Sequence, residues 1–339
     1  MSIDIQQNVN LRTLNTLGLD VAAEYFVRVE SVEDLRAALA FSREKRHELL
    51  VLGGGSNLVL HRYVRGLCIQ IAISGYQLDG PRVSVGAGTN WHQFVLATLR
   101  DKRFGLENLS LIPGQAGAAP IQNIGAYGVE LAERLVRVDA IDIETGEDIS
   151  LTNSECEFGY RQSVFKTRLL DKAVITAITL DLDLSFEPEL GYVGLSQYLD
   201  AQKLAISADT VSQAVCAVRL SKLPNPIVVG NVGSFFKNPV VGAEQIAGLK
   251  SDNPDMPMYR QDNGDYKLSA AFLIDLAGLK GMRVGQATVS TQHALVIQNE
   301  GGATGREVLA LAGQVQKIIK SRFDIGLDIE PRVFPSRRS

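Results

Sequence analysis

The sequence Leu111-Ile-Pro-Gly-Gln-Ala-Gly-Ala-Ala-Pro-Ile-Gln-Asn-Ile-Gly-Ala-Tyr-Gly128 is rich in glycine and almost free of charge, and Pro113 and Pro120 bracket its first half. Glycine lets a backbone approach a ligand closely, and successive amide groups in such a loop can converge on an anion. The prolines restrict the backbone, so the loop starts partly ordered. The pattern favours a ligand cradle over a buried loop that only packs two layers together.

The overall composition is that of an ordinary globular protein of two or three domains: 339 residues, 45% hydrophobic and 21% charged. A net charge of −4 argues against a nucleic-acid or membrane-surface protein. The first residues contain no basic region followed by an apolar signal core, so we expect a cytoplasmic protein. Cys68, Cys156 and Cys216 lie far apart, and no CxxC or HExxH motif occurs, so no metal is expected.

Two further glycine-rich stretches lie before residues 111–128 in the chain. Residues 49–60 read as a buried strand, a turn at Gly53-Gly-Gly-Ser-Asn57 and a second apolar segment. The turn lacks the Gly-Lys-Ser/Thr ending of a Walker loop, and Leu58 stands where a Rossmann fingerprint needs its third glycine. A structural hairpin turn and a phosphate-binding turn both remain open. Gly86-Ala-Gly-Thr-Asn90 repeats the GxG pattern, again without the third glycine.

Other elements follow from periodicity and capping signals. We expect a helix capped by Ser31, a helix over residues 91–100 capped by Asn90, a hairpin over 135–151, a strand over 172–182, a proline-punctuated linker over 221–226, helices over 267–276 and 306–319, and strands within 286–298.

Two short polar segments are candidate sites. Tyr160 and Arg161 stand side by side among aromatic residues, where they could simply form a sheet-edge pair. Gly233-Ser234 places a hydroxyl on a glycine turn before two phenylalanines. Phe236 rules out the Gly-x-Ser-x-Gly elbow of hydrolases, and no His–Asp partner lies nearby, so a serine nucleophile is not expected.

Six motifs in one order resemble the UDP-N-acetylenolpyruvoylglucosamine reductase family, a family of flavoenzymes also called UDP-N-acetylmuramate dehydrogenases. The matching residues are 52–57 (LGGGSN), 112–128, 158–161 (FGYR), 222–224 (KLP), 233–239 (GSFFKNP) and Glu330. Gly-Tyr-Val at 191–193 resembles the substrate-loop tyrosine of the type I branch.

The resemblance implies an α+β protein with a vanillyl-alcohol-oxidase-type (PCMH-like) FAD-binding fold of two α+β subdomains and a C-terminal α+β substrate-binding domain. It implies four segments: 1–72 as the first FAD-binding subdomain, 73–215 as the second with the substrate-loop tyrosine, 216–326 as the substrate-binding domain, and 327–339 as a C-terminal segment with Glu330 and a disordered tail.

The resemblance also implies the reaction. In the family, NADPH reduces FAD, and a hydride then passes to the enolpyruvyl methylene of UDP-N-acetylglucosamine enolpyruvate, which gives UDP-N-acetylmuramate for peptidoglycan and thus for cell shape and division. We expect non-covalent FAD, because neither glycine stretch contains the His or Cys that attaches flavin in related oxidases. We expect a cytoplasmic monomer that binds neither nucleic acid nor membrane.

Site residues carry over position by position. The implied catalytic residues are Arg161, Ser234 and Glu330. The implied substrate-binding residues are Tyr160, Tyr192, Lys222 and Asn238. The implied FAD-binding residues are Gly53, Gly54, Gly55, Ser56, Asn57, Leu58, Pro113, Gly114, Gly117, Ala118, Pro120, Ile121, Gln122, Asn123 and Gly125.

The C-terminal register is ambiguous. The family usually reads Leu-Glu-Pro-Glu-Val-Arg, whereas this chain reads Leu327-Asp-Ile-Glu-Pro-Arg332. Alignment on Glu-Pro places Arg332 at the acid position, and an ungapped count from Phe323 places Glu330 there. We adopt the ungapped count. His293, where relatives often have Gln, is given no role.

Two other functions fit the same glycine loops. One is an FAD-linked oxidase of the same fold, and the other is a nucleotide-binding regulator in which Ser234 is purely structural. Flavin absorption would separate the regulator from both enzymes.

Overall fold

The computed structural model describes residues 3–261 and 263–335, which divide into two compact units. Unit 1 contains Met1–Val9, Ala23–Gly54 and Arg65–Ser221, and unit 2 contains Asn10–Ala22, Gly55–Val64 and Lys222–Ser339. The predicted segment boundaries at 72, 215 and 326 stay predictions. The predicted disorder of residues 336–339 lies outside the described residues.

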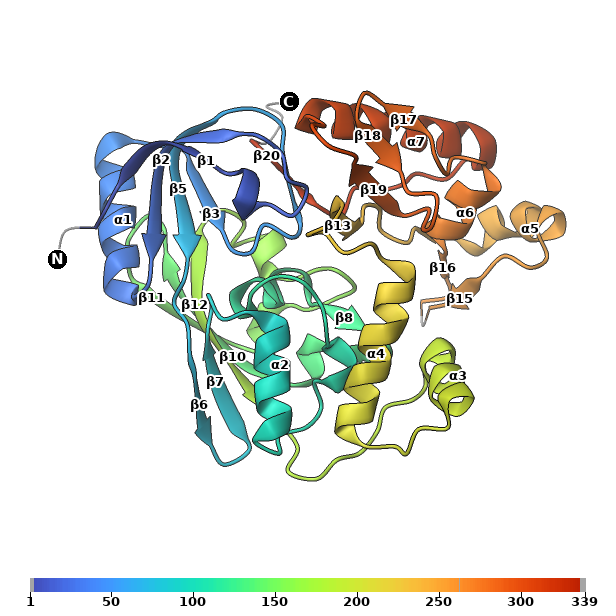
Figure 1. Ribbon diagram of the computed structural model, residues 1–339, viewed down its shortest axis with the longest axis horizontal. Helices are drawn as coiled ribbons and strands as arrows, with labels where there is room; N and C mark the ends of the chain where they lie inside the picture. The colour runs from blue at the N-terminus through green and yellow to red at the C-terminus, as the bar shows by residue number, and fades with distance from the viewer. Residues whose placement is uncertain (1–2, 262, 336–339) are drawn as a thin grey trace. The chain divides into compact units, whose positions relative to one another are not determined.

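The first sheet of unit 1 has the strand order β1-β2-β5-β3 (Figure 1). Its strands are β1 (Gln6–Asn10), β2 (Ala22–Val29), β3 (Leu49–Leu52) and β5 (Val64–Ile71). Helix α1 (Val32–Lys45) follows β2, and the Ser31 side chain accepts a hydrogen bond from the Asp34 amide at 3.0 Å. This is the predicted N-cap, and it is confirmed.

The second sheet of unit 1 is antiparallel, with the strand order β11-β10-β12-β7-β6. Val138, Ile178 and Val85 lie opposite one another on β10, β12 and β7, and all three are buried. Such cross-strand rows hold a sheet in register. The strands are β6 (Tyr76–Asp79), β7 (Arg82–Gly86), β10 (Leu135–Asp142), β11 (Asp148–Thr152) and β12 (Ala173–Asp181), which confirms the predicted hairpin and long strand.

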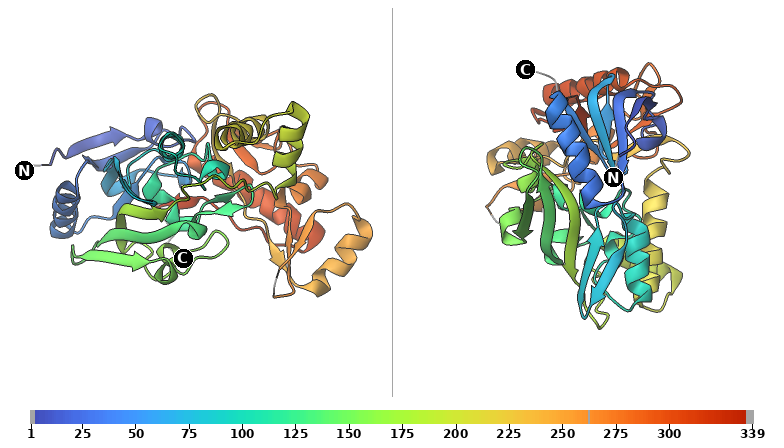
Figure 2. Two further views of the ribbon diagram at one scale, coloured as in Figure 1. Left: turned by 90° about the horizontal axis from the view of Figure 1, so that it is seen from below. Right: turned by 90° about the vertical axis from the view of Figure 1, so that its left-hand side faces the viewer.

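Helix α2 (Trp91–Arg100) follows β7 and lies beside it (Figures 1 and 2). Asn90 caps it as predicted, because its side chain accepts from the Gln93 amide at 3.0 Å. The rest of unit 1 consists of β8 (Gly125–Ala126), β9 (Val129–Glu130), α3 (Val193–Gln202), α4 (Ala208–Lys222) and short 3₁₀ turns at Glu107–Leu109, Ala116–Ala118, Pro120–Gln122, Leu131–Glu133, Ser154–Cys156 and Val164–Lys166.

Unit 2 is built on a four-stranded sheet with the order β13-β19-β18-β17. A three-stranded sheet and the parallel pair β20–β4 complete its strands. The elements are a 3₁₀ turn at Arg12–Leu14, β4 (Leu58–Leu60), β13 (Gly230–Ser234), β14 (Val240–Val241), α5 (Ala243–Asp252), β15 (Met258–Arg260), β16 (Tyr266–Leu268), α6 (Ala270–Leu276), β17 (Arg283–Val284), β18 (Ala287–Val289), β19 (Val296–Asn299), α7 (Gly305–Phe323) and β20 (Arg332–Phe334).

Two sequence predictions need correction. The expected helix over 267–276 begins only at Ala270, because Lys267 pairs with Val240 and Tyr259 in the three-stranded sheet. The turn after β3 is also not a hairpin. Strand β3 pairs with β5, and β4 pairs with β20, so Gly53–Asn57 connects two different sheets.

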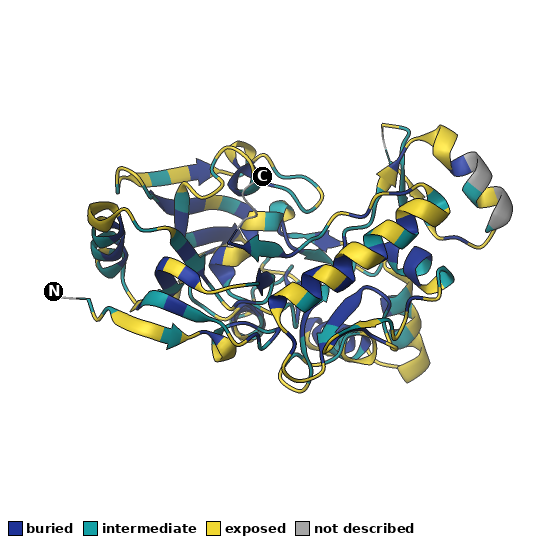
Figure 3. Ribbon diagram, turned by 90° about the horizontal axis from the view of Figure 1, so that it is seen from above, coloured by how far each residue is buried: buried dark blue, intermediate teal, exposed yellow. Residues whose placement is uncertain are grey.

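Buried residues are frequent on the strands of the sheets, and the longer helices carry both buried and exposed residues (Figure 3). The three cysteines are free thiols. Within the part of the chain that the structure describes, no helix is both long and apolar enough to span a membrane.

Candidate active site

The two glycine stretches meet in unit 1. A Cβ atom built on Gly54 would lie 3.1 Å from the Cα atom of Gly114, and one built on Gly53 would lie 2.9 Å from Gln115 Oε1. A side chain at Gly54 would press on the Gly114 backbone, so the two glycines favour this close approach of the loops. Gln115 Oε1 is buried and has no hydrogen-bond partner among the described residues. A buried acceptor beside such a backbone-lined cradle fits a ligand that donates hydrogen bonds.

The first half of the loop is fixed to the segment that follows β7. The Trp91 amide donates to Gly114 O at 3.1 Å, and the Gly117 amide donates to Ala87 O at 2.9 Å. A Cβ on Gly117 would lie only 2.4 Å from Ala87 Cβ, so position 117 requires glycine for packing. The sequence showed the GxG pattern at 86–90, and here it serves as the support of the cradle.

The second half of the loop is held by Asn123, which is 1% exposed. Its Nδ2 donates to Glu130 at 2.7 Å, and its Oδ1 accepts from the Ala132 amide at 3.0 Å. The Asn123 side chain therefore orders the loop that precedes β8. Of the other predicted cofactor residues, Gly54, Pro113, Ala118 and Ile121 are exposed, Gly53, Gly114, Gln122 and Gly125 are half-buried, and Gly117 and Pro120 are buried.

The remaining glycine-turn residues belong to unit 2. Gly55 has φ +61°, and a Cβ there would lie 2.1 Å from Leu14 O, so backbone packing alone requires this glycine. Asn57 O accepts a hydrogen bond from the Arg332 amide at 2.9 Å, and Leu58 begins β4. Ser56 is half-buried between them. Part of the turn therefore has a structural purpose.

Valine at position 114 is expected to abolish flavin binding. Gly114 has φ +119°, which a β-branched residue does not adopt without strain, and it lies against Gly54. The flavin-to-protein absorbance ratio of purified Gly114→Val measures the effect. Gly313→Val is the matched control, because a Cβ at Gly313 in α7 meets nothing within 4 Å. Equal flavin content in the two variants would remove the 111–128 loop from the site.

Arg161 lies in a tight turn rather than at a sheet edge. Gly159 and Gln162 exchange backbone hydrogen bonds of 3.1 Å, and Arg161 has φ +54°. Its Nη2 donates to Gly125 O at 3.1 Å, and its guanidinium carbon lies 5.4 Å from the centre of the Tyr160 ring. The structure thus brings the predicted Arg161, with Tyr160 beside it, to the 111–128 loop. The sheet-edge alternative is wrong.

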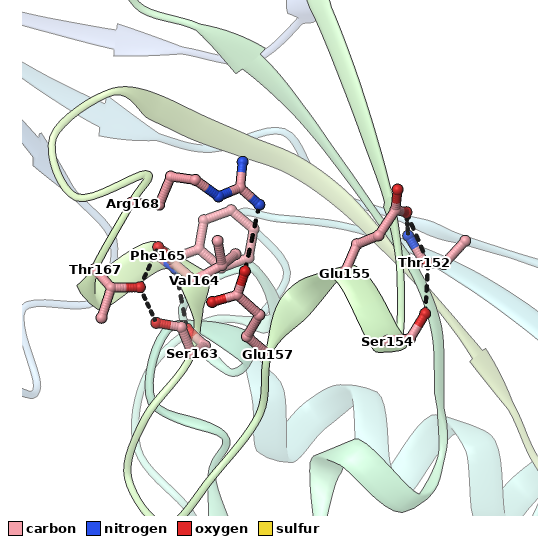
Figure 4. Close-up of polar contacts among 9 residues, drawn as sticks. All are labelled: Thr152, Ser154, Glu155, Glu157, Ser163, Val164, Phe165, Thr167 and Arg168. Atoms are coloured by element: carbon pink, nitrogen blue, oxygen red, sulfur yellow. Dashed lines mark hydrogen bonds and ion pairs between the residues drawn. The ribbon is translucent and has the colours of Figure 1, made fainter.

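Polar contacts hold this turn on both sides (Figure 4). Ser163 Oγ accepts from the Phe165 amide at 3.2 Å and donates to Ile121 O at 2.6 Å. Glu157 and Arg168 form an ion pair of 3.6 Å across the segment. These contacts hold the backbone on both sides of Arg161 in place.

Tyr127 belongs to the 111–128 loop, and the sequence analysis gave it no role. It contacts Tyr192, a predicted substrate-binding residue. Its ring lies 5.0 Å from that of Tyr192 in an edge arrangement, and Tyr192 is the N-cap residue of α3. Burial raises the pKa of Tyr127 to about 12. Tyr127 is therefore a neutral hydroxyl at physiological pH, beside a half-exposed tyrosine.

The structure brings the backbone segments that carry Ser234 and Glu330 together in unit 2. Ser234 ends β13, and the amide of Glu330 donates to the carbonyl of the next residue, Phe235, at 3.0 Å. Phe236 and Ile329 form a bridge, so the two segments run antiparallel. Arg332 lies further along, in β20 opposite Leu58. Residue 330 is thus the one of the two candidates that pairs next to Ser234, and its role as the acid stays a prediction.

The other predicted substrate residues of unit 2 differ in their surroundings. Asn238 Oδ1 accepts from the Ala270 amide at 3.0 Å, so this side chain helps to cap α6. Lys222 is exposed. The pKa of His293, to which the sequence analysis assigned no role, is lowered mainly by burial. The charges of Lys222 and Lys280 lower it further. His293 Nδ1 accepts from the Leu295 amide at 3.3 Å.

Comparisons with known proteins agree with the predicted fold. Residues 23–152 match the model of an FAD binding domain, and residues 225–334 match the C-terminal domain of UDP-N-acetylenolpyruvoylglucosamine reductase. The solved structure of UDP-N-acetylenolpyruvylglucosamine reductase from Thermus caldophilus is 28% identical, with a TM-score of 0.70 over 99% of this chain and all of the other. The predicted FAD-binding fold of the vanillyl-alcohol-oxidase type is confirmed.

Curated relatives match over nearly the whole chain. UDP-N-acetylenolpyruvoylglucosamine reductase of Chromobacterium violaceum is 45% identical over 98% of this chain and 100% of the relative. The enzyme of the same description from Pseudomonas fluorescens is 44% identical over 98% of this chain and 99% of the relative.

Proposed function

The chain belongs to the UDP-N-acetylenolpyruvoylglucosamine reductase family, and we propose that it divides the work of the reaction between Arg161, which binds an anion, and Ser234 with Glu330, which deliver a proton. The chain is an FAD-containing, NADPH-dependent oxidoreductase. It reduces the enolpyruvyl group of UDP-N-acetylglucosamine enolpyruvate, and the product, UDP-N-acetylmuramate, serves peptidoglycan synthesis. The full-length identity does not favour the oxidase or the regulator.

The glycine cradle fits FAD. Gly53, Gly54 and Gly114 would accommodate the diphosphate by close backbone approach, and the buried Gln115 Oε1 would accept a hydrogen bond from a hydroxyl or N–H group of the cofactor. When bound, FAD accepts a hydride from NADPH and passes a hydride to the substrate. Gly55 packs against Leu14 O, and the Asn123 side chain is hydrogen-bonded to Glu130. We therefore propose that both residues contact the cofactor only through their backbone atoms.

We propose that Arg161 binds the substrate carboxylate. Hydride addition at C3 of the enolpyruvyl group leaves negative charge on C2 and on the adjoining carboxylate. A guanidinium presents two parallel N–H donors to a carboxylate, and donors fixed in advance stabilise developing charge. Arg161 is anchored to Gly125 O and rests beside Tyr160, which supports such a fixed role.

We propose that Ser234 gives the proton that C2 requires. The Ser234 side chain is half-buried at the end of β13 and makes no hydrogen bond to a side chain or backbone group within residues 3–261 and 263–335. Its hydroxyl is thus available to a reacting atom. The buried Phe235 and Phe236 behind it exclude water from that side.

We propose that Glu330 assists at the same carbon as an acid. A carboxylate facing a developing negative charge would raise the barrier, so the residue acts in its protonated form. The observation that supports this most strongly is the 3.0 Å hydrogen bond from the Glu330 amide to Phe235 O, one residue from Ser234.

The flavin is expected to leave the protein completely on denaturation. The segments 53–58 and 113–125 contain no His or Cys that could attach it. Heating or acid precipitation followed by centrifugation tests this, with absorbance near ~450 nm read in supernatant and pellet. Yellow colour that stays with the washed pellet would show a covalent bond.

We propose further that the protein works as a cytoplasmic monomer. Sedimentation velocity of the flavin-loaded protein tests the monomer. A concentration-independent dimer mass would contradict it.

A further inference from the structure

The side chain of Asn108 joins two segments of unit 1 that lie far apart in the sequence. Asn108 belongs to the 3₁₀ turn Glu107–Leu109, just before the 111–128 loop, and is 3% exposed. Its Nδ2 donates to Tyr127 O at 2.7 Å and to Glu189 O at 2.9 Å. An amide nitrogen carries two N–H groups, so it can give one to each carbonyl. The buried amide therefore ties the 111–128 loop to the segment that precedes α3.

The segment before α3 has few other polar contacts. Residues 184–192 contain no helix and no strand. Among the residues that the structure describes, the bond from Asn108 is the one hydrogen bond that joins the backbone of 184–191 to another segment. The Gly191 amide bonds locally, to Glu189 Oε1 at 2.7 Å. The Phe186 ring lies 5.8 Å from that of Phe104, but apolar burial is less directional than a hydrogen bond.

The two segments that Asn108 joins carry two tyrosines in contact. Tyr127 belongs to the 111–128 loop, and Tyr192, the predicted substrate-binding tyrosine, stands three residues after Glu189. Their rings lie 5.0 Å apart in an edge arrangement. Asn108 holds the backbone on both sides of this ring contact, at Tyr127 itself and close to Tyr192. One donor group thus fixes the position of Tyr192 relative to the cradle loop.

We propose that Asn108 positions Tyr192 for the substrate, by holding this tyrosine beside the 111–128 loop before the substrate arrives. The proposal rests on the proposed function and on the predicted role of Tyr192, and it adds a residue to them. Asn108 is a positioning residue that acts through Tyr192 and touches no reacting atom. A side chain that is already in place loses less conformational freedom on binding. Its contribution therefore lies in KM rather than in the hydride or proton step.

Steady-state kinetics of Asn108→Leu test the proposal. Leucine has nearly the same shape but no donor, so Tyr127 O and Glu189 O lose their hydrogen bonds from residue 108. We expect the KM for the enolpyruvyl substrate to rise about 5- to 100-fold, the usual effect of a buried polar group left unpaired. The kcat should stay within about threefold of wild type, because the chemical steps do not involve Asn108.

Asn153→Leu is the matched control. The half-buried Asn153 makes the same kind of bridge in unit 1, since its Nδ2 donates to Ala132 O at 2.7 Å and to Leu135 O at 2.8 Å. This bridge does not involve the segment that carries Tyr192, so the KM of Asn153→Leu should match that of wild type. Equal KM values for Asn108→Leu and Asn153→Leu would overturn the proposal.

A double-mutant cycle with Tyr192→Ala decides whether Asn108 acts through that tyrosine. In the Tyr192→Ala background, Asn108→Leu should change the KM by less than about twofold, because the ring to be positioned is gone. An undiminished effect in this background would mean that Asn108 supports the fold or the cradle instead, and would overturn the proposal.

Asn108→Ser replaces Asn108→Leu in the same cycle if the leucine variant does not retain flavin. Serine keeps one O–H donor, so it can serve one of the two carbonyls. A KM raised at least about threefold, in protein with Tyr192 but not in Tyr192→Ala, supports the proposal. An unchanged KM overturns it.

Hydrogen exchange of the flavin-loaded proteins gives a readout that does not depend on turnover. The amides of Leu195 and Ser196 donate to Tyr192 O at 2.9 and 3.2 Å. They should exchange at least about threefold faster in the Asn108 variant than in wild type or Asn153→Leu. Unchanged exchange would contradict the proposal. Failure of the proposed function looks different, because wild-type reduced enzyme would then not react with the enolpyruvyl substrate at all.

Discussion

Ser234→Ala is expected to slow the reoxidation of reduced flavin by the enolpyruvyl substrate by at least about 10²-fold, the usual size of a lost general acid. Flavin reduction by NADPH is expected to remain nearly unchanged, since it does not require protonation of C2. Stopped-flow absorbance of the two half-reactions under anaerobic conditions measures both rates.

The position of Ser234 allows the two half-reactions to be compared without a change in the fold. Ser234 and Val296 pair through backbone atoms, so removal of one hydroxyl leaves β13 in place. Ser154→Ala is the control, because Ser154 is exposed and its hydroxyl hydrogen-bonds, among the residues that the structure describes, only to Thr152 (Figure 4). Equal damage to both half-reactions in Ser234→Ala would mean that Ser234 holds the flavin or the fold instead.

Glu330→Gln is expected to slow the same reoxidation by about 10²-fold or more and to leave NADPH reduction intact. Glutamine keeps the shape and a hydrogen-bond donor but cannot give up a proton. The backbone hydrogen bond from residue 330 to Phe235 O does not depend on the side chain, so the C-terminal register should survive. Glu330→Asp retains the acid and retracts it, and should lose less.

Arg332→Gln provides the matched test of register. If the Glu-Pro alignment were correct, position 332 would stand where the family has its acid, and Glu330→Gln would turn over like wild type. The pairing of Arg332 with Leu58 in β20, away from Ser234 along the strand, predicts the opposite ranking. A Glu330→Gln variant with wild-type reoxidation would leave Ser234 to protonate C2 alone.

Much of the fold was predictable because its signals are local. Caps at Ser31 and Asn90 are fixed by side chains three residues from the amides they bind, and the hairpin of β10 and β11 follows from alternation. The strand at Tyr266–Leu268 was missed because it depends on distant partners, Val240 and Met258–Arg260. Pairing between separated segments leaves little trace in a short sequence window.

The site was predictable where its chemistry rests on the backbone. Repeated glycines mark the cradle, but the sequence alone could not separate Gly54, which faces Gly114, from Gly55, which packs on Leu14.

The most direct test of the whole account is a single anaerobic turnover. Wild-type protein is first reduced with one equivalent of NADPH and then mixed with UDP-N-acetylglucosamine enolpyruvate, while flavin absorbance is followed and the product is identified by mass spectrometry. UDP-N-acetylglucosamine, which lacks the enolpyruvyl group, serves as the control. The account predicts full return of the oxidised flavin spectrum with one equivalent of UDP-N-acetylmuramate, and a flavin that stays reduced with the control. Flavin that stays reduced with both compounds would contradict it.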